Sequence, residues 1–306
     1  MLAEASEFGE GARFVGVGAE AFLVEGGDMP WRVAYLGTDP DERGGIWTFP
    51  AGSWRGLDAL SVTSDRFSGV FALACGASHK EPCLLLSSMN NASDAGAQEL
   101  TELAGARLPE GIEGRGLAYD PARDAVCVFG NALVCFDTRW TTMIGPECGV
   151  KIIDVAWAPG TATMIAIAEH GRWWMRTQNA SGKLQHWVEQ PPIQAEDDPV
   201  GASVSNREVA LFGRRTWWHV LPSGGVHTCT QDQDVGAVIV YGSSTDLVLR
   251  DGQVRHGYSD WCAERVDLGT DPVIDWSKGS CRESVNPRVL TSTRIVGTSA
   301  CLMFFD

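Results

Sequence analysis

The chain has 306 residues and a formal net charge of −15, and 44% of its residues are hydrophobic. This charge argues against nucleic acid as a main partner, because binding to phosphates needs clustered Lys and Arg, and here 24 basic residues are outnumbered by 39 acidic ones. The hydrophobic content, with 12 Trp and 11 Phe, excludes a disordered chain, and 35 Gly and 14 Pro indicate frequent turns.

Groups of four short apolar runs, bounded by turn residues, repeat along the first half of the chain. Each run is too short for an average helix and has the length of a β-strand. The first three groups occupy residues 13–18, 21–26, 31–37 and 45–50, then 57–64, 69–76, 83–88 and 98–103, then 116–121, 125–130, 132–137 and 141–145.

The second half of the chain continues the same plan. Its runs occupy residues 154–159, 163–171, 172–178 and 184–190, then 201–206, 208–215, 216–222 and 225–231, then 236–242, 246–252, 253–259 and 263–269, followed by a tail at 288–292, 294–299 and 301–306. The pairs Trp173-Trp174 and Trp217-Trp218 mark the repeat, since they lie 44 positions apart. We interpret both pairs as core packing, with a carbohydrate platform as the alternative.

A four-stranded unit that recurs with a period of about 20 to 50 residues is typical of a β-propeller. The sequence therefore predicts one all-β domain over residues 1–306, with seven four-stranded blades, or six as the alternative. The N-terminal segment is expected to pair with the C-terminal tail, which would supply the missing strand and leave no open sheet edge. Helix is expected at most over residues 95–106, and residues 89–97 and 275–287 are predicted to be long loops.

Several of these units resemble the WD repeat, in which a strand ending in Trp-Ser-Pro is followed by an Asp-Gly turn and a strand that closes on Trp-Asp. The residues that carry the resemblance are Ala156 to Pro159, His170-Gly171, Arg176-Thr177, Phe136-Asp137 and Asp251-Gly252. The Gly-His dipeptide of that family is missing, so the chain resembles a divergent member. The resemblance implies a β-propeller that serves as a scaffold for other proteins.

The cysteines predict a reducing compartment. Nine occur, an odd number with no C-x-x-C pair, which argues against a zinc site. Most lie inside apolar runs, as Cys127 and Cys135 do, where a reduced thiol behaves as a small hydrophobic side chain. The first residues show no secretion signal, and no apolar run reaches the roughly 18 residues of a membrane helix. We therefore expect a soluble chain of the cytoplasm or nucleus that does not insert into membranes.

Motifs for cofactors and catalysis are weak. Gly16, Gly18 and Ala21 fit the G-x-G-x-x-A turn of dinucleotide sites, but too few residues follow for the helix that this turn must open, so we interpret the glycines as strand and turn positions. The six His form no metal-binding pattern, and neither a P-loop nor a G-x-S-x-G motif occurs. Residues 38–49 resemble the Asp-box of sialidase-type propellers, without the arginine and tyrosine set that those enzymes use. The sequence predicts no cofactor, no metal and no catalytic residue.

Acidic residues gather in the predicted connections between units. In a propeller, the connections from the fourth strand of one blade to the first strand of the next lie on one face, so their carboxylates would line one rim. Such a rim would attract a basic partner segment, and ordinary solvated turns are the alternative. The predicted rim residues are Glu196, Asp197, Asp198, Asp232, Asp234, Asp267 and Asp271.

We therefore expect a non-catalytic interaction scaffold, a subunit of an intracellular multiprotein complex that docks other proteins on its rim loops, some through basic segments. The alternative is a propeller enzyme or lectin that acts on glycans or small molecules at the central channel. Carboxylate, Arg and Tyr side chains that converge there would favour the alternative.

Overall fold

The computed structural model describes residues 2–18, 21–27, 31–36, 46–50, 57–64, 70–76, 83–88, 100–158, 163–178, 182–193, 197–204, 209–221, 225–241, 244–249, 254–258, 290–291, 295–297 and 300–304. The chain forms two compact units. Unit 1 comprises Met1–Cys148 and Ser299–Asp306, and unit 2 comprises Gly149–Thr298. That residues 1–306 form a single domain stays a prediction.

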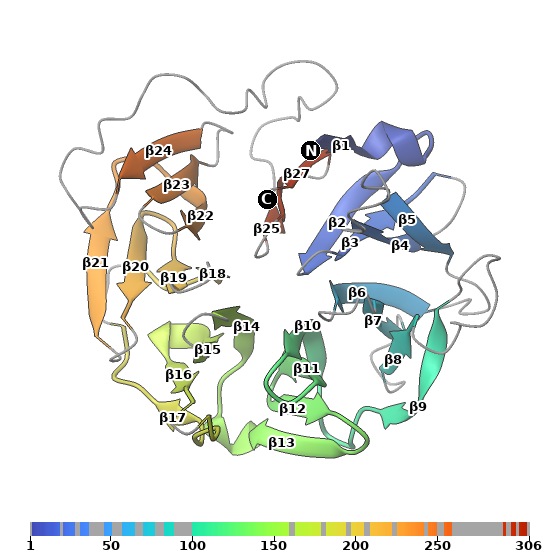
Figure 1. Ribbon diagram of the computed structural model, residues 1–306, viewed down its shortest axis with the longest axis horizontal. Coiled ribbons are helices and arrows are strands. Elements are labelled where there is room, and N and C mark those ends of the chain that lie inside the picture. Colours follow the sequence, from blue (N-terminus) through green and yellow to red (C-terminus); the bar gives the residue numbers. More distant parts are fainter. Residues whose placement is uncertain are drawn as a thin grey trace. The chain divides into compact units, whose positions relative to one another are not determined.

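Unit 1 contains three four-stranded antiparallel sheets in its described part, and the strands of each sheet follow one another in chain order (Figure 1). Short connections of this kind favour antiparallel neighbours. The strands are β2 (Arg13–Gly18), β3 (Ala21–Glu25), β4 (Trp31–Leu36) and β5 (Ile46–Pro50), then β6 (Leu57–Ser64), β7 (Val70–Gly76), β8 (Leu84–Ser87) and β9 (Thr101–Arg107), then β10 (Gly114–Asp120), β11 (Ala125–Gly130), β12 (Leu133–Phe136) and β13 (Trp140–Ile144).

Unit 2 repeats this arrangement with two four-stranded sheets and a sheet of three described strands. Its strands are β14 (Ile152–Ala158), β15 (Thr163–Ala168), β16 (Trp173–Arg176) and β17 (Val188–Glu189), then β18 (Gly201–Val204), β19 (Val209–Phe212), β20 (Thr216–Val220) and β21 (Val226–Thr230), then β22 (Val235–Tyr241), β23 (Ser244–Leu249) and β24 (Val254–Tyr258), with β25 (Leu290–Thr291) paired to β26 (Ile295–Gly297). The predicted run at 263–269 lies outside the described residues.

Burial explains why the middle strands appear in the sequence as continuous apolar runs. Every residue of β7, β11, β15 and β20 is buried, whereas the outermost strands β13, β17 and β21 are largely exposed. A strand that is covered on both faces loses the alternation of apolar and polar residues that marks a half-exposed strand. The described sheets therefore pack face to face with their neighbours within each unit.

Strand β7 shows this two-sided packing residue by residue. Val70 and Ala72 pack with Leu23 of the preceding sheet, while Phe71 and Leu73 pack with residues of the following sheet, among them Val128. Successive side chains on a strand point to opposite faces, so one strand serves two cores. The tryptophan pairs also follow the prediction: the Trp173-Trp174 pair on β16 and the Trp217-Trp218 pair on β20 are buried.

The two ends of the chain pair with each other inside unit 1. Strand β1 (Leu2–Glu4) lies antiparallel to β27 (Cys301–Phe304), with Leu2 opposite Met303, and the Ala5 N–H donates to the Ala300 carbonyl at 2.7 Å. The predicted pairing of N-terminal and C-terminal segments is confirmed (Figure 1).

The glycines of the G-x-G-x-x-A motif occupy strand positions. Gly16 and Gly18 lie in β2, and the chain returns as strand β3. A Cβ on Gly18 would lie 1.8 Å from the carbonyl oxygen of Val62 on β6, so close packing against the neighbouring sheet requires glycine there.

The possible helix at residues 95–106 is not formed over the described residues 101–106, and the run predicted at 98–103 overlaps a strand. Residues 101–107, which overlap the possible helix at 95–106, form strand β9. The described regular elements are otherwise strands, together with three short 3-10 helices, η1 (Ala5–Phe8), η3 (Pro146–Cys148) and η5 (Glu169–Gly171). The all-β fold class is confirmed.

The expectation of reduced cysteines is also wrong. Cys75 is bonded to Cys83, and Cys127 is bonded to Cys135. Cys229 and Cys301 are disulfide-bonded too, so six of the seven cysteines that the structure describes are oxidised. The apolar runs did not reveal these disulfides, because a buried strand accommodates a disulfide as well as it accommodates a free thiol. The cysteine argument for a reducing compartment therefore fails. Among the described residues, no helix is long and apolar enough to cross a membrane.

Candidate functional site

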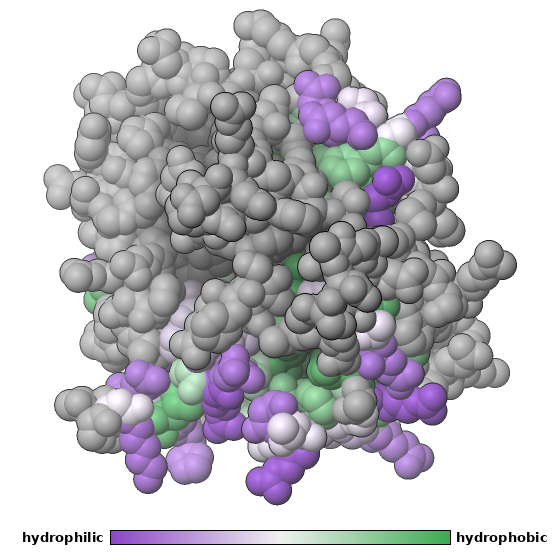
Figure 2. Space-filling model, turned by 45° about the vertical axis from the view of Figure 1, so that its right-hand side comes forward, coloured by the Kyte–Doolittle hydropathy of each residue, from purple (hydrophilic) through white to green (hydrophobic). Residues whose placement is uncertain are grey.

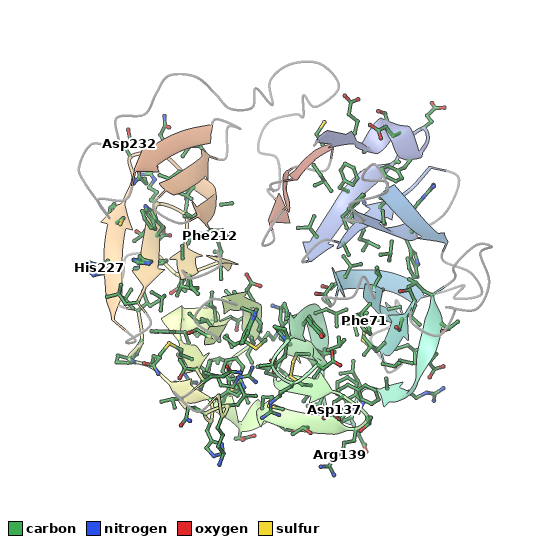
Figure 3. The ribbon with its side chains drawn as sticks, viewed as in Figure 1. Phe71, Asp137, Arg139, Phe212, His227 and Asp232 are labelled. Carbon is green, nitrogen blue, oxygen red and sulfur yellow. A yellow bond between two sulfur atoms is a disulfide. The ribbon has the colours of Figure 1, made fainter. Side chains whose placement is uncertain are left out.

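The structure places four of the seven predicted rim acids, all in unit 2. Asp197 and Asp198 lie in the loop before β18, and Asp232 and Asp234 lie in the loop after β21. Figure 3 labels Asp232 beyond the end of β21. The remaining three, Glu196, Asp267 and Asp271, lie outside the described residues.

Asp197 binds the turn between β19 and β20, residues 213–215, which we name the rim turn. Its Oδ2 atom accepts a hydrogen bond from the N–H of Arg215 and another from the N–H of Thr216, the latter at 3.1 Å. A Cβ on Gly213 would lie 2.8 Å from the carbonyl oxygen of Asp198, so the rim turn packs closely on this loop. The loop before the sheet is therefore fastened to the rim turn.

Asp234 fastens the loop after the sheet to the same turn. Its Oδ2 atom lies 2.8 Å from Nε of Arg214, and its Oδ1 atom lies 3.0 Å from Nε of Arg215. These hydrogen bonds lower the pKa of Asp234 and raise the pKa of Arg214, because each charge stabilises the other. Backbone bonds reinforce the contact, since the Val235 N–H donates to the Arg214 carbonyl at 2.6 Å.

The four placed acids thus divide into two kinds. Asp197 and Asp234 are held by the rim turn, whereas Asp198 and Asp232 are exposed. The sequence reasoning missed Arg214 and Arg215 as partners of these carboxylates. The predicted order of strands could have indicated these partners. In a four-stranded meander, the turn after the second strand lies at the same end of the sheet as both flanking connections.

Neutral groups help to fasten the corresponding turn in other sheets. In the β10–β13 sheet, the Asn131 side chain accepts from the Glu113 N–H at 2.9 Å and donates to the Gly111 carbonyl at 2.8 Å. In the β14–β17 sheet, the Ile193 N–H donates to the Gly171 carbonyl at 2.9 Å. Fastening the turn is therefore a general structural task in these sheets, and an ion pair also contributes in the β14–β17 sheet, where Arg172 Nε lies 2.7 Å from Glu189 Oε1. In the β18–β21 sheet, carboxylates from both flanking loops bind the turn.

Tyr, carboxylate and Arg side chains come together at the turn between β10 and β11, the combination that would favour an enzyme. Tyr119 donates from its hydroxyl to the Asp124 carboxylate, and Asp120 accepts from the Ala122 N–H at 3.2 Å and lies 3.9 Å from Nε of Arg123. Each of these contacts joins residues that lie at most five positions apart, so together they shape the hairpin turn.

Two histidines meet across β20 and β21, which sequence spacing did not indicate. His219 lies opposite His227, and their ring centroids are 6.4 Å apart. His219 is buried, and this burial, with a smaller contribution from His227, lowers its pKa to about 4. His227 is exposed on the outer strand (Figure 3). Among the described residues, no group of three or more His, Cys, Asp or Glu could hold a metal ion.

On the face seen in Figure 2, the described residues form no large hydrophobic patch. Figure 2 shows projecting hydrophilic side chains in purple, with small green hydrophobic areas between them. Among the described large hydrophobic residues, Val188 and Val200 are the exposed ones, at 54% and 51%. Val200 lies two positions after Asp198 in the same loop, so this loop carries both exposed acidic and exposed apolar residues.

No protein-family model and no curated protein matches the chain. Among solved structures, a streptogramin B lyase superposes with a TM-score of 0.57 at 10% identity, over 99% of this chain and 96% of the lyase chain. BBS1N, solved in complex with ARL6DN, superposes with a TM-score of 0.50 at 15% identity, over 89% of this chain and 85% of that chain.

These two structures are β-propellers, and at such low identity the likeness shows the fold alone. The chain therefore has a β-propeller fold. Its membership of the WD-repeat class and its count of seven blades stay predictions.

Proposed function

We propose that the protein is a protein-interaction propeller that binds a basic partner segment beside the rim turn of the β18–β21 sheet. One observation carries the proposal: Asp197 and Asp234, from the loops before and after this sheet, both bind the rim turn. The neighbouring exposed acids, Asp198 and Asp232, are therefore held on two loops that are fixed to a common point. A preformed pair of carboxylates loses little conformational entropy when a partner binds.

The charges at this site have different tasks. Asp234 is largely neutralised by Arg214 and Arg215. We assign the attraction for a basic segment to Asp198 and Asp232 because both are exposed. Glu196, Asp267 and Asp271 complete the proposed acidic set. Val200 adds a small apolar contact next to the acidic loop. A mixed site of this kind suits a peptide that carries both basic and apolar residues.

The comparisons bear on this proposal in opposite ways. BBS1N was solved bound to ARL6DN, so a propeller similar to this chain binds a protein. The other similar structure is an enzyme, a lyase, which keeps the alternative of a catalytic propeller or a lectin as a competing outcome. The contacts at Tyr119, Asp120 and Asp124 favour a structural interpretation of the described Tyr and carboxylate cluster. We therefore favour the scaffold, as a subunit of a larger assembly.

The test measures how fast a synthetic peptide rich in Lys and Arg associates with the protein. Wild type is compared with the Asp198→Asn/Asp232→Asn variant over a salt series from about 0.05 to 0.5 M, in which screening removes the effect of exposed charges. We expect association with the variant to be about three- to tenfold slower at low salt, and the two rates to converge at high salt.

A control variant, Glu10→Gln/Glu110→Gln, removes two exposed acids from unit 1 and has the same net charge. It should associate almost as fast as wild type. Equal rates for wild type and the Asp198/Asp232 variant, or equal slowing by the control, would show that the rim does not steer the peptide. Binding of glycans that is unaffected by the variant would support the lectin alternative instead.

A further inference from the structure

Two disulfides occupy equivalent places in neighbouring sheets of unit 1. Cys75 at the end of β7 is bonded to Cys83, the residue before β8, and Cys127 on β11 is bonded to Cys135 on β12. Each bond joins the second strand of its sheet to the third, and each has a sequence separation of 8. Cys127 and Cys135 lie directly opposite each other in the ladder.

The two bonds also lie on the same face of their sheets. Cys75 packs with Phe71 and Leu73 on the face of β7 that turns away from the β2–β5 sheet. On β11, Val126 and Val128 face the β6–β9 sheet, so the side chain of Cys127 between them points to the opposite face. Each disulfide therefore lies on the face turned away from the preceding sheet. The two disulfides thus join the same pair of strands, have the same sequence separation and lie on the same face. We interpret them as the same structural feature in two neighbouring sheets.

The two bonds differ in exposure. Cys127 and Cys135 are 0% and 3% exposed, and Cys75 is 3% exposed, whereas Cys83 is partly exposed. Thiol–disulfide exchange begins with a thiolate that attacks a sulfur atom, so it requires access to one of the two sulfurs. Cys83 is the most exposed of the four residues, so we expect a thiolate to reach the Cys75–Cys83 bond more readily than the Cys127–Cys135 bond in the folded protein.

We propose that this protein matures in an oxidising compartment, where a thiol–disulfide oxidoreductase closes both bonds, and that, of these two bonds, Cys75–Cys83 alone remains able to exchange after folding. In each closure, two protein thiols give up two protons and two electrons, a protein S–S bond forms, and the disulfide of the oxidant becomes a dithiol. The Cys127–Cys135 bond must form before the β10–β13 sheet is buried. This inference is independent of the rim site, which lies in unit 2.

The first measurement asks whether the bonds exist after export. The protein is produced with a secretion signal in an oxidising host compartment, denatured without reductant, alkylated, and analysed by peptide mass mapping. We expect linked peptides for Cys75 with Cys83 and for Cys127 with Cys135, and no alkyl group on these four residues. Alkylation of all four residues would overturn the proposal, as would links that join other partners.

The second measurement follows reduction of the folded protein by a small thiol, with samples alkylated over time. We expect Cys75 and Cys83 to be labelled at least tenfold faster than Cys127 and Cys135. Labelling of both pairs at one rate, or of the Cys127 pair first, would contradict the assigned roles.

The melting temperatures of cysteine variants provide a third measurement, which remains informative if a variant folds poorly. We expect the Cys127→Ala/Cys135→Ala variant to melt about 5 to 10 °C below wild type, because a bond that closes a short loop restricts the unfolded chain. The matched variant Cys75→Ala/Cys83→Ala should also melt lower, and it should lose the fast phase of labelling while keeping the slow one. Retention of the fast phase in that variant would count against the proposal.

Discussion

The buried imidazole of His219 lowers the free energy of unfolding by an amount that depends on pH. The residue is 4% exposed, and burial lowers its pKa from the usual 6.5 to about 4. In the unfolded chain the same group takes up a proton near pH 6.5. Between these values the unfolded state binds more protons than the folded state, so the free energy of unfolding falls as the pH decreases through this window.

We predict that His219 lowers stability by about 1 to 2 kcal/mol between about pH 7 and pH 5. The His219→Gln variant lacks the titrating group and should show a flatter dependence of unfolding free energy on pH, measured by urea denaturation at several pH values. The exposed neighbour serves as the control, because His227→Gln should keep most of the wild-type slope. Parallel slopes for wild type and His219→Gln would show that His219 is not the group that titrates.

At the scale of strands, neighbouring sheets within each unit are joined by side chains that follow a bulge. In unit 1, the Leu117 N–H of β10 donates to Ser61 Oγ of β6 at 3.0 Å. In unit 2, the Ala202 N–H of β18 donates to Asp154 Oδ2 of β14 at 2.8 Å. The register of β6 shifts just before Ser61, and the register of β14 shifts just before Asp154. A bulge redirects a side chain, which here lets a first strand bind the first strand of the next sheet.

We predict that Ser61→Ala and Asp154→Ala each lower the free energy of unfolding by about 1 to 3 kcal/mol, because each leaves a part-buried backbone N–H without its acceptor. Burial raises the pKa of Asp154, while the N–H groups of Ala202 and Val155 oppose that shift. Asp154→Asn keeps one acceptor oxygen and should recover part of the loss. Thr141→Ala, on the exposed face of β13, is the control and should be nearly neutral in chemical denaturation. If the loss of unfolding free energy is no larger than that of the control, these hydrogen bonds do not stabilise the packing of neighbouring sheets.

At the scale of the whole chain, the first and last strands depend on each other. Strand β1 covers one edge of β27, and without it the backbone groups of residues 301–303 that face β1 would lose their partners. Unit 1 includes residues from both ends of the sequence, so its integrity requires the chain to return to its start. An uncovered strand edge also invites pairing between molecules.

We predict that deletion of residues 1–4 lowers the free energy of unfolding by about 2 to 4 kcal/mol, a large share of the stability of a typical domain. This short deletion spares β2, which begins at Arg13 and which a deletion through residue 18 would remove. Thermal melting gives the stability, and size-exclusion chromatography detects association through the exposed edge. The control is Ser6→Ala in the exposed turn after β1. A truncated protein that stays monomeric and melts at the wild-type temperature would show that β1 does not close the fold.

Local patterns in the sequence located most of the fold. Apolar runs bounded by Gly and Pro placed the strands from 13 to 231, and the repeated tryptophan pairs at 173–174 and 217–218 indicated buried third strands. Both follow from interactions between residues close in sequence, since a short turn leaves a strand little choice but to pair with the next one. The possible helix at residues 95–106 does not form over residues 101–107, where the chain pairs with β8 as strand β9, in agreement with the predicted run at 98–103.

The sequence by itself determined the all-β class, the order of strands and the pairing of the two ends. Only the tertiary structure decided that Cys127 bonds to Cys135, that Asp197 and Asp234 are held by the rim turn, and that Asp198 and Asp232 are exposed. Composition could not separate these acids, because they are chemically identical. Their roles depend on which N–H or guanidinium group from another strand lies within hydrogen-bonding distance, and that distance is fixed only when the sheets pack.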